Sequence, residues 1–131
     1  MPFRILRVTL LAVAVVAAAF AQVYTIQRVA GTYTAGYSGD GDQAVTAKLN
    51  FPEDVAVDLA GNFYIADTTN NRVRKVTAAG VITTIAGDGT CGYNGDGILA
   101  GTARLCSPHG VATDNNGNIY IADSLNHRVR R

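Results

Sequence analysis

The chain has 131 residues, of which 48% are hydrophobic and 16% charged, and its formal net charge is +1. These averages combine two unlike parts. Residues 1–21 hold 17 apolar side chains and no glycine, whereas residues 22–131 hold all 14 glycines and nine basic against ten acidic side chains. With 110 residues, this second part is too short for a large two-domain enzyme. Its near-neutral charge lacks the basic excess of nucleic-acid-binding proteins or of proteins held on membranes by charge.

Residues 1–21 have the layout of a secretory signal peptide. Two arginines precede an apolar run at 10–20, and small residues then predict cleavage between Ala21 and Gln22. A membrane anchor is the alternative, but a span needs about 20 apolar residues and this run has 11. We therefore expect a secreted or periplasmic mature chain, with no membrane attachment after cleavage.

An internal repeat dominates the remainder. Residues 26–75 align with residues 82–131 without a gap, with 27 identities in 50 pairs at an offset of 56. The segment GYSGDG at 36–41 returns as GYNGDG at 92–97, for example. Chance does not produce this similarity, so the sequence indicates a tandem duplication of one structural unit.

Each unit contains short β-prone runs separated by turns rich in Gly and Asn. In the first unit these runs are 55–58, 62–66, 72–77 and 81–86. Their apolar residues occur on both faces, which suits a sheet that lies between neighbouring sheets. Four antiparallel strands followed by a long connection predict an all-β fold, a β-propeller of four-stranded blades.

The strand order predicts about two blades. Residues 52–87 form the first blade and residues 108–131 form three strands of a second, while residues 24–31 align with the end of the first blade and predict a separate outer strand. Propellers have typically about four to eight blades. We therefore expect a fragment of a longer propeller. Self-assembly is the alternative, expected only if the chain is complete.

The long connections at 32–51 and 88–107 and the turn at 68–71 are expected at one end of the sheets. Long loops on a rigid scaffold are where binding usually resides. We therefore expect a protein or glycan ligand on this long-loop face, with no nucleic acid as a partner. The candidate ligand-binding residues are Tyr37, Asp40, Asp67, Asn70, Tyr93, Asp96, Asp123, Asn126 and His127.

Several of these residues also have structural interpretations. Asp67 and Asp123 are each followed by an Asn and then by Arg72 or Arg128, so the carboxylates could tether turn amides while the arginines pair between blades. The tyrosines could pack the long loops onto the blade. No arrangement of nucleophile, base and acid is visible, so no catalytic residue is predicted.

Cys91 and Cys106 replace Ala35 and Asn50 of the first copy, so both cysteines are present in one copy and absent from the other. In an exported chain this paired gain predicts a disulfide at the base of the second long loop. Two unrelated thiols are the alternative. A metal site is disfavoured because the chain has no CxxC spacing.

The Gly-Asp-Gly segments raise the question of calcium, with Asp40 and Asp42, or Asp96 alone, as ligands. Calcium takes about six to eight oxygen ligands, and Asp42 has Ile98 as its counterpart in the second copy. Tight turns stabilised by Asp and Gly explain the pattern without a metal. We therefore expect no cofactor and keep calcium as the alternative.

The runs PEDVAVDLAGNFYIADTTNNRVRKV at 52–76 and PHGVATDNNGNIYIADSLNHRVRR at 108–131 resemble NHL repeats, and GYSGDGDQAVTAKLNFP resembles the connection in bacterial and teneurin NHL domains. The resemblance implies a propeller, commonly six-bladed, that serves as an extracellular or scaffold binding platform. A minority of the family are metal-dependent lyases, hydrolases or lactonases. At the position of Asp54 the family prefers Gly, which the second copy has as Gly110. Asp54 therefore departs from the family pattern.

The function expected is therefore an exported NHL-repeat propeller segment that acts as a binding or scaffold module. Two alternatives remain open at this point. One is part of a metal-dependent propeller enzyme of the lyase or lactonase kind, and the other is the sensor domain of a surface receptor.

Overall fold

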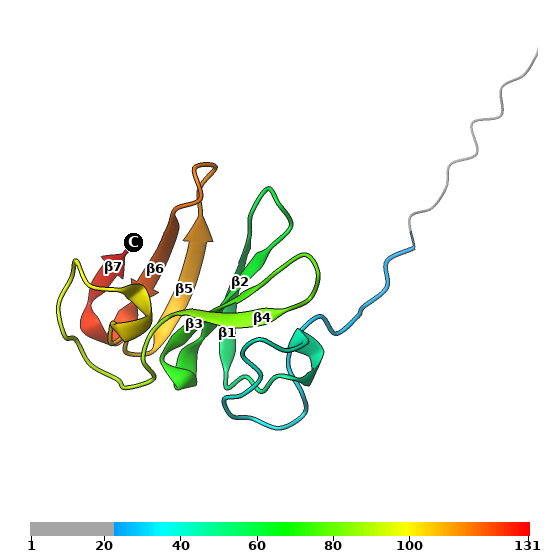
Figure 1. The fold of residues 1–131 in the computed structure, drawn as a ribbon, viewed down its shortest axis with the longest axis horizontal. Coiled ribbons are helices and arrows are strands. Elements are labelled where there is room, and N and C mark those ends of the chain that lie inside the picture. Colours follow the sequence, from blue (N-terminus) through cyan, green and yellow to red (C-terminus); the bar gives the residue numbers. More distant parts are fainter. Residues whose placement is uncertain (1–22) are drawn as a thin grey trace, which may run out of the picture.

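The computed structural model describes residues 23–131, so the leader predicted at 1–21 and its cleavage site at Ala21 and Gln22 lie outside the described residues. Two antiparallel sheets lie side by side in this part of the chain (Figure 1). No helix in it is long and apolar enough to cross a membrane. The predicted all-β architecture is confirmed.

The strands of each sheet follow one another in chain order. The predicted strands are confirmed, with ends that differ from the prediction by at most three residues. They form strands because β-branched and aromatic side chains fill these runs and Gly and Asn bound them. The first sheet contains β1 (Pro52–Val57), β2 (Phe63–Asp67), β3 (Arg72–Val76) and β4 (Ile82–Ala86), and the second contains β5 (Pro108–Thr113), β6 (Ile119–Asp123) and β7 (Arg128–Arg130). Residues 23–131 also contain four single 3-10 turns, η1 (Ala44–Thr46), η2 (Thr68–Asn70), η3 (Ala100–Thr102) and η4 (Ser124–Asn126).

One aspartate organises the first hairpin of each sheet. Oδ1 of Asp58 accepts hydrogen bonds from the backbone N–H groups of Ala60 and Asn62, both at 2.9 Å. Its Oδ2 accepts from the Tyr64 hydroxyl at 3.0 Å. Asp114 makes the same contacts in the second sheet. The repeated sequence therefore produces a repeated turn.

Both sides of the first sheet are covered by apolar contacts. One side packs against the second sheet, with Leu105 of the second long connection between them. The other side is covered by Ala44 and Ala47 of the first long connection. This arrangement explains why the apolar residues of the strands do not simply alternate with polar ones. The first cluster contains Tyr64, Ala66, Val73, Ala86, Leu105, Val111 and Ile121, and the second contains Ala44, Ala47, Ile65, Val76 and Ile82.

The residue that departs from the family pattern joins the two sheets. Oδ2 of Asp54, on β1, accepts a hydrogen bond from the backbone N–H of Val111, on β5, at 2.8 Å. Gly110 lies beside it, and a Cβ at this glycine would lie 3.6 Å from Oδ2 of Asp54. Asp54 of one blade therefore contacts the backbone of the next blade beside the glycine that occupies its own position there.

The first long connection also runs along the outer edge of β4. The N–H of Gly41 donates to the carbonyl of Ile82 at 2.8 Å, and the N–H of Ile82 donates to the carbonyl of Asp42 at 3.0 Å. Gln43 and Val81 form an isolated antiparallel bridge. The outer edge of the complete blade is therefore paired at one end with its own connection.

Residues 24–31, predicted as an outer strand, are not paired as a strand in the described part of the chain. These residues belong to neither sheet, and the N–H of Gly31 donates to the carbonyl of Ala44 at 2.9 Å. A strand requires a neighbouring strand for its backbone hydrogen bonds. Residues 24–31 lie on the far side of the first sheet from the three-stranded sheet that such a strand would complete (Figure 1).

Candidate functional site

The predicted loop arrangement brings both long connections to one end of the sheets. The hairpin turns between β1 and β2 and between β5 and β6 lie at the opposite end (Figure 1). The first connection contacts η2, because the N–H of Thr69 donates to the carbonyl of Asn50 at 3.1 Å. The second repeats this contact between Leu125 and Cys106, also at 3.1 Å.

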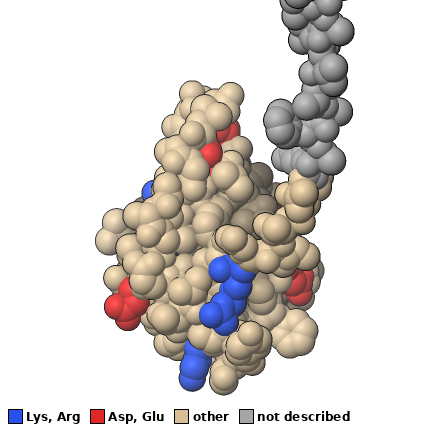
Figure 2. Space-filling view, turned by 90° about the vertical axis from the view of Figure 1, so that its right-hand side faces the viewer, with Lys and Arg blue, Asp and Glu red and all other residues tan. Residues whose placement is uncertain are grey.

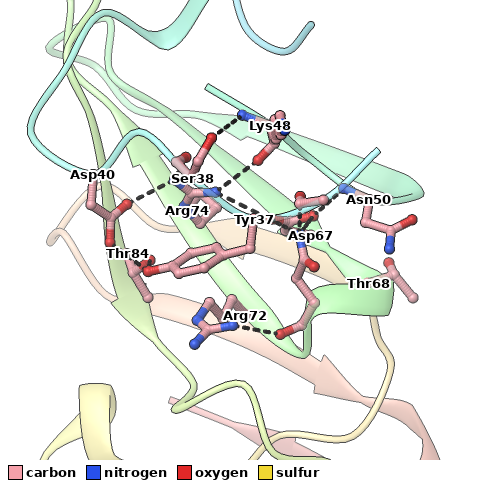
Figure 3. Close-up of polar contacts among 12 residues, drawn as sticks. Tyr37, Ser38, Asp40, Lys48, Asn50, Asp67, Thr68, Arg72, Arg74 and Thr84 are labelled. Atoms are coloured by element: carbon pink, nitrogen blue, oxygen red, sulfur yellow. Dashed lines mark hydrogen bonds and ion pairs between the residues drawn. The ribbon is translucent and has the colours of Figure 1, made fainter. Parts of the chain in front are cut away.

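Arg74 holds the first connection from beneath (Figure 3). It is completely buried, and its guanidinium donates to Asp40 Oδ1 at 2.7 Å and to Asp67 Oδ2 at 3.3 Å. It also donates to the carbonyls of Ser38 at 3.0 Å and Lys48 at 3.4 Å. We call Arg74, Asp67 and Asp40 the first loop anchor. A rigid strand thereby fixes two separate points of a long loop.

Asp67 extends this network to the backbone. Its Oδ1 accepts from the N–H of Asn50 at 2.8 Å and from Nδ2 of Asn70 at 2.9 Å. Nδ2 of Asn70 also donates to the carbonyl of Gly36 at 2.7 Å. Because Asp67 is 0% exposed, its carboxylate faces the loop backbone rather than solvent.

Tyr37 packs the loop onto the blade. Its hydroxyl donates to Asp40 Oδ2 at 2.8 Å and lies 3.1 Å from the hydroxyl of Thr84. The guanidinium of Arg72 lies 3.8 Å from the centre of the tyrosine ring. Arg72 therefore stacks on the ring, and the buried carboxylate of Asp67 pairs with Arg74.

The second copy builds the same anchor. Arg130, Asp123 and Asp96 form the second loop anchor, in which the guanidinium of Arg130 lies 3.0 Å from Asp96 Oδ1 and 3.4 Å from Asp123 Oδ2. Asn126 donates to Asp123 and to the carbonyl of Gly92. Tyr93 donates to Asp96 at 2.7 Å, and Arg128 stacks on its ring.

The predicted ligand residues therefore separate into two groups. Asp67, Asp123 and Asn126 are buried and Asn70 is half-buried, so these four side chains hold the loops. The ligand role of the exposed residues stays a prediction. They are Tyr37, Asp40, Tyr93, Asp96 and His127.

The disulfide predicted between Cys91 and Cys106 is present. Cys106 is buried, and its backbone N–H donates to Asp123 Oδ1 at 2.7 Å. The disulfide therefore ties the start of the second loop to the point where the second loop anchor holds its end.

Asp40 and Asp96 are engaged by the protein itself. Asp40 accepts from Arg74 and Tyr37, and Asp96 accepts from Arg130 and Tyr93. Residues 23–131 contain no group of three or more His, Cys, Asp or Glu side chains that could hold a metal ion.

Contacts within the two loop anchors lower the pKa of Asp40 and of Asp96. For Asp40, burial raises the pKa, but hydrogen bonds from Thr84, Tyr37 and Arg74 outweigh burial and the net shift is downward. For Asp96, the hydrogen bond from Tyr93 and the charge of Arg130 lower the pKa. The same hydrogen bond raises the pKa of the Tyr93 hydroxyl.

These shifts predict acid sensitivity. A carboxyl group whose folded pKa lies below its ordinary value of 3.8 contributes stability above that pH and loses it as the pH falls through the folded pKa. We expect the free energy of unfolding, measured by urea titration at a series of pH values, to fall below about pH 4. The variant Asp40→Asn should show a smaller fall, and an equal fall in both proteins would contradict the assignment to Asp40.

Phe51 and Leu125 are among the exposed apolar residues of this face that the sequence reasoning missed. Phe51 is 73% exposed and Leu125 is 59% exposed. Phe51 has a φ of 53°, a left-handed conformation that is rare for a bulky residue. Their counterparts in the other copy are the polar Ser107 and Thr69. This contrast, apolar in one copy and polar in the other, could have identified both from sequence.

Comparison with known proteins agrees with this architecture. A model of the NHL repeat matches residues 105–131, and a model of the teneurin NHL domain matches residues 32–92. Teneurin-4 of Homo sapiens is 35% identical over 100 residues, which cover 66% of this chain and 4% of teneurin-4.

Solved structures of Bacteroides proteins are also similar. An auxiliary nutrient binding protein from Bacteroides ovatus matches with a TM-score of 0.64 and 32% identity over 77% of this chain and 26% of that protein. A protein of unknown function from Bacteroides thetaiotaomicron matches with a TM-score of 0.66 and 26% identity over 76% of this chain and 25% of that protein. The chain thus spans about a quarter of these structures and a far smaller part of teneurin-4. With its tandem repeat, its two sheets and these matches, the chain belongs to the NHL-repeat family of β-propellers.

Proposed function

We propose that this propeller segment is a binding module whose long-loop face takes a protein or glycan ligand. The observation that carries the proposal is the contrast between buried anchors and exposed apolar side chains on the same loops. Arg74 and Asp67 are each 0% exposed, whereas Phe51, next to the Asn50 amide that Asp67 holds, is 73% exposed. A rigidly held, exposed aromatic side chain contributes contact area at low entropic cost.

Two of the similar structures support the proposal of a binding module. They are described as auxiliary nutrient binding proteins, one from Bacteroides ovatus and one from Bacteroides thetaiotaomicron. The latter matches this chain at 28% identity with a TM-score of 0.62. Such a function requires loops that present side chains and keep their shape, and the two loop anchors supply that property.

The test removes the exposed aromatic group without disturbing the fold. The variant Phe51→Ser carries the residue that stands at the same position in the second copy, where Ser107 also has a positive φ of 48°. We expect the full chain, screened against an array of oligosaccharides and a panel of extracellular proteins, to bind at least one probe, with about 30-fold weaker binding for Phe51→Ser. The matched control is Leu59→Asn, which changes another exposed apolar residue, at the opposite end of the sheets, to the Asn115 of the second copy. A panel without any binding, or equal binding by both variants, would contradict the proposal.

We also propose that the module acts outside the cytoplasm, as a secreted or periplasmic protein, which the leader pattern at residues 1–21 supports. The expected result is an exported chain whose N-terminus, read by mass spectrometry, is Gln22. A chain recovered only with residues 1–21 attached would refute the cleavage.

A further inference from the structure

Two asparagines of the second copy are each followed by a glycine. Asn94 precedes Gly95 in the second long connection, and Asn116 precedes Gly117 in the turn between β5 and β6. Glycine has no Cβ to shield its backbone nitrogen, so that nitrogen can attack the side-chain amide of the asparagine before it. A Cβ placed on either glycine would meet nothing within 4 Å apart from its chain neighbours. Both nitrogens are therefore open, and the two pairs differ only in how the asparagine side chain is held.

The side chain of Asn94 is fixed by the loop in which it lies. Its Nδ2 donates to the carbonyl of Thr102 at 2.9 Å, and its Oδ1 accepts from the backbone N–H of Arg104 at 2.8 Å. Both hydrogen bonds have ordinary lengths, and both have to break before the amide carbon can turn toward Gly95. Asn94 is exposed, so hydrogen bonds rather than burial restrain this amide.

The side chain of Asn116 has no such restraint. It is exposed, and within residues 23–131 no hydrogen bond holds its amide group, since only its backbone N–H is engaged, by Asp114 Oδ1 at 2.9 Å. The N–H of Gly117 donates to the carbonyl of Asp114 at 3.2 Å, which is at the long end of the usual range. The amide of Asn116 is therefore free to rotate beside a nitrogen that is only weakly bonded.

The first copy shows that neighbouring strands and sheets leave this position open. Ala60 stands there at the position of Asn116, in a sheet that has four strands and the second sheet against one side. The turn between β3 and β4 lies next to it, where the N–H of Ala78 donates to Asn62 Oδ1 at 3.3 Å. Ala60 is nevertheless exposed. By the symmetry of the repeat, the exposure of Asn116 does not depend on which chain segment lies beside β7.

We propose that Asn116 is a site of spontaneous deamidation, through which the turn between β5 and β6 of the folded protein acquires a carboxylate. The backbone nitrogen of Gly117 loses its proton to solvent base and forms a bond to Cγ of Asn116. The bond from Cγ to Nδ2 breaks, and Nδ2 takes up a proton and leaves as ammonia. The product is a cyclic imide. Water then opens this ring at one of its two carbonyl groups, which gives aspartate or isoaspartate.

The new carboxylate increases the negative charge of an end of the molecule that is already acidic. The hairpin turns at 58–62 and 114–118 contain Asp58 and Asp114 and neither Lys nor Arg. In Figure 2 the hairpin turns form the narrow projection at the top, and the charged side chains visible near its tip are carboxylates. The modification therefore lies at the end of the sheets opposite to the long-loop face, and no cation of these turns neutralises it.

Isoaspartate also changes the backbone of the turn. The N–H groups of Asn116 and Asn118 both donate to Oδ1 of Asp114, at 2.9 Å and 2.8 Å. Isoaspartate at position 116 places one additional carbon atom in the main chain between these two N–H groups. Their spacing then no longer matches a single acceptor oxygen, so this product weakens the contacts by which Asp114 organises the hairpin.

Peptide mass spectrometry of the full chain, sampled during incubation at mildly alkaline pH, tests the proposal. In the folded protein we expect Asn116 to convert at least about tenfold faster than Asn94, because two hydrogen bonds have to break first at Asn94. Isoaspartate should be among the products. In guanidinium chloride the two sites should convert at similar rates, since neither side chain is then held. A folded protein in which Asn94 converts as fast as Asn116, or in which Asn116 stays intact while the unfolded chain converts, would overturn the proposal.

Matched variants assign the change in charge to one residue. Asn116→Ala carries the residue of the first copy, Ala60, and isoelectric focusing should show no acidic form during the period in which the wild type develops one. Asn94→Ala should develop the acidic form at the wild-type rate. An acidic form that persists in Asn116→Ala, or that is lost in Asn94→Ala, would place the modification elsewhere and overturn the assignment to Asn116.

Discussion

Replacing Arg74 with alanine should lower the free energy of unfolding by about 3–5 kcal/mol, as expected when one partner of a buried ion pair is removed. Arg74 and Asp67 are both 0% exposed. The substitution leaves the Asp67 carboxylate buried without its cation and releases the carbonyls of Ser38 and Lys48. Urea unfolding of the wild type and the variant measures the difference.

Two further variants separate the anchor from a general loss of charge. Arg104→Ala breaks an exposed pair with Asp88 at 3.5 Å and should cost less than about 1 kcal/mol. Combining Arg74→Met with Asp67→Asn removes both charges and should cost clearly less than the sum of the two single changes. Additive effects, or equal losses for Arg74→Ala and Arg104→Ala, would show that the buried pair does not hold the loop.

The second large effect is expected from the disulfide. The double variant Cys91→Ala with Cys106→Asn gives the second copy the residues of the first. It should lower the free energy of unfolding by about 3 kcal/mol, since a cross-link that closes a loop of this length restricts the unfolded chain by that amount. The two cysteines are 15 residues apart.

Chemical reduction supplies the control for this variant. Wild-type protein unfolded under reducing conditions should lose the same stability as the double variant, and the double variant should not respond to reductant. Thiol titration of the unreduced, unfolded mature chain should find no free cysteine. A double variant as stable as the oxidised wild type would show that the second loop anchor alone holds this loop.

Much of this architecture could be predicted from the repeat. The tandem alignment predicted the strands, since turn residues recur at fixed positions, and the meander of strands predicted that both long connections share one end. The paired replacement of Ala35 and Asn50 by cysteines predicted the disulfide, because two residues that change together in one copy indicate contact.

The remainder depends on contacts that a linear pattern does not contain. The strand at residues 24–31 was predicted from its sequence alone, but a strand exists only beside a partner. Arg72 and Arg74 lie on the same side of β3. The alternation of side chains along the strand therefore could not show which of the two arginines reaches Asp67. Burial resolves this choice, since Arg74 lies under the loop and Arg72 stacks on Tyr37. The contact of Asp54 with Val111 likewise crosses between sheets.

The pairing of the first connection with β4 has a consequence for how the protein behaves in concentrated solution. An uncovered outer strand is a template for indiscriminate addition of other chains. The contacts of Gly41, Asp42 and Gln43 with Val81 and Ile82 occupy the end of that edge with the blade's own backbone. This end of the outer edge of β4 is thereby closed to the addition of other chains through backbone hydrogen bonds.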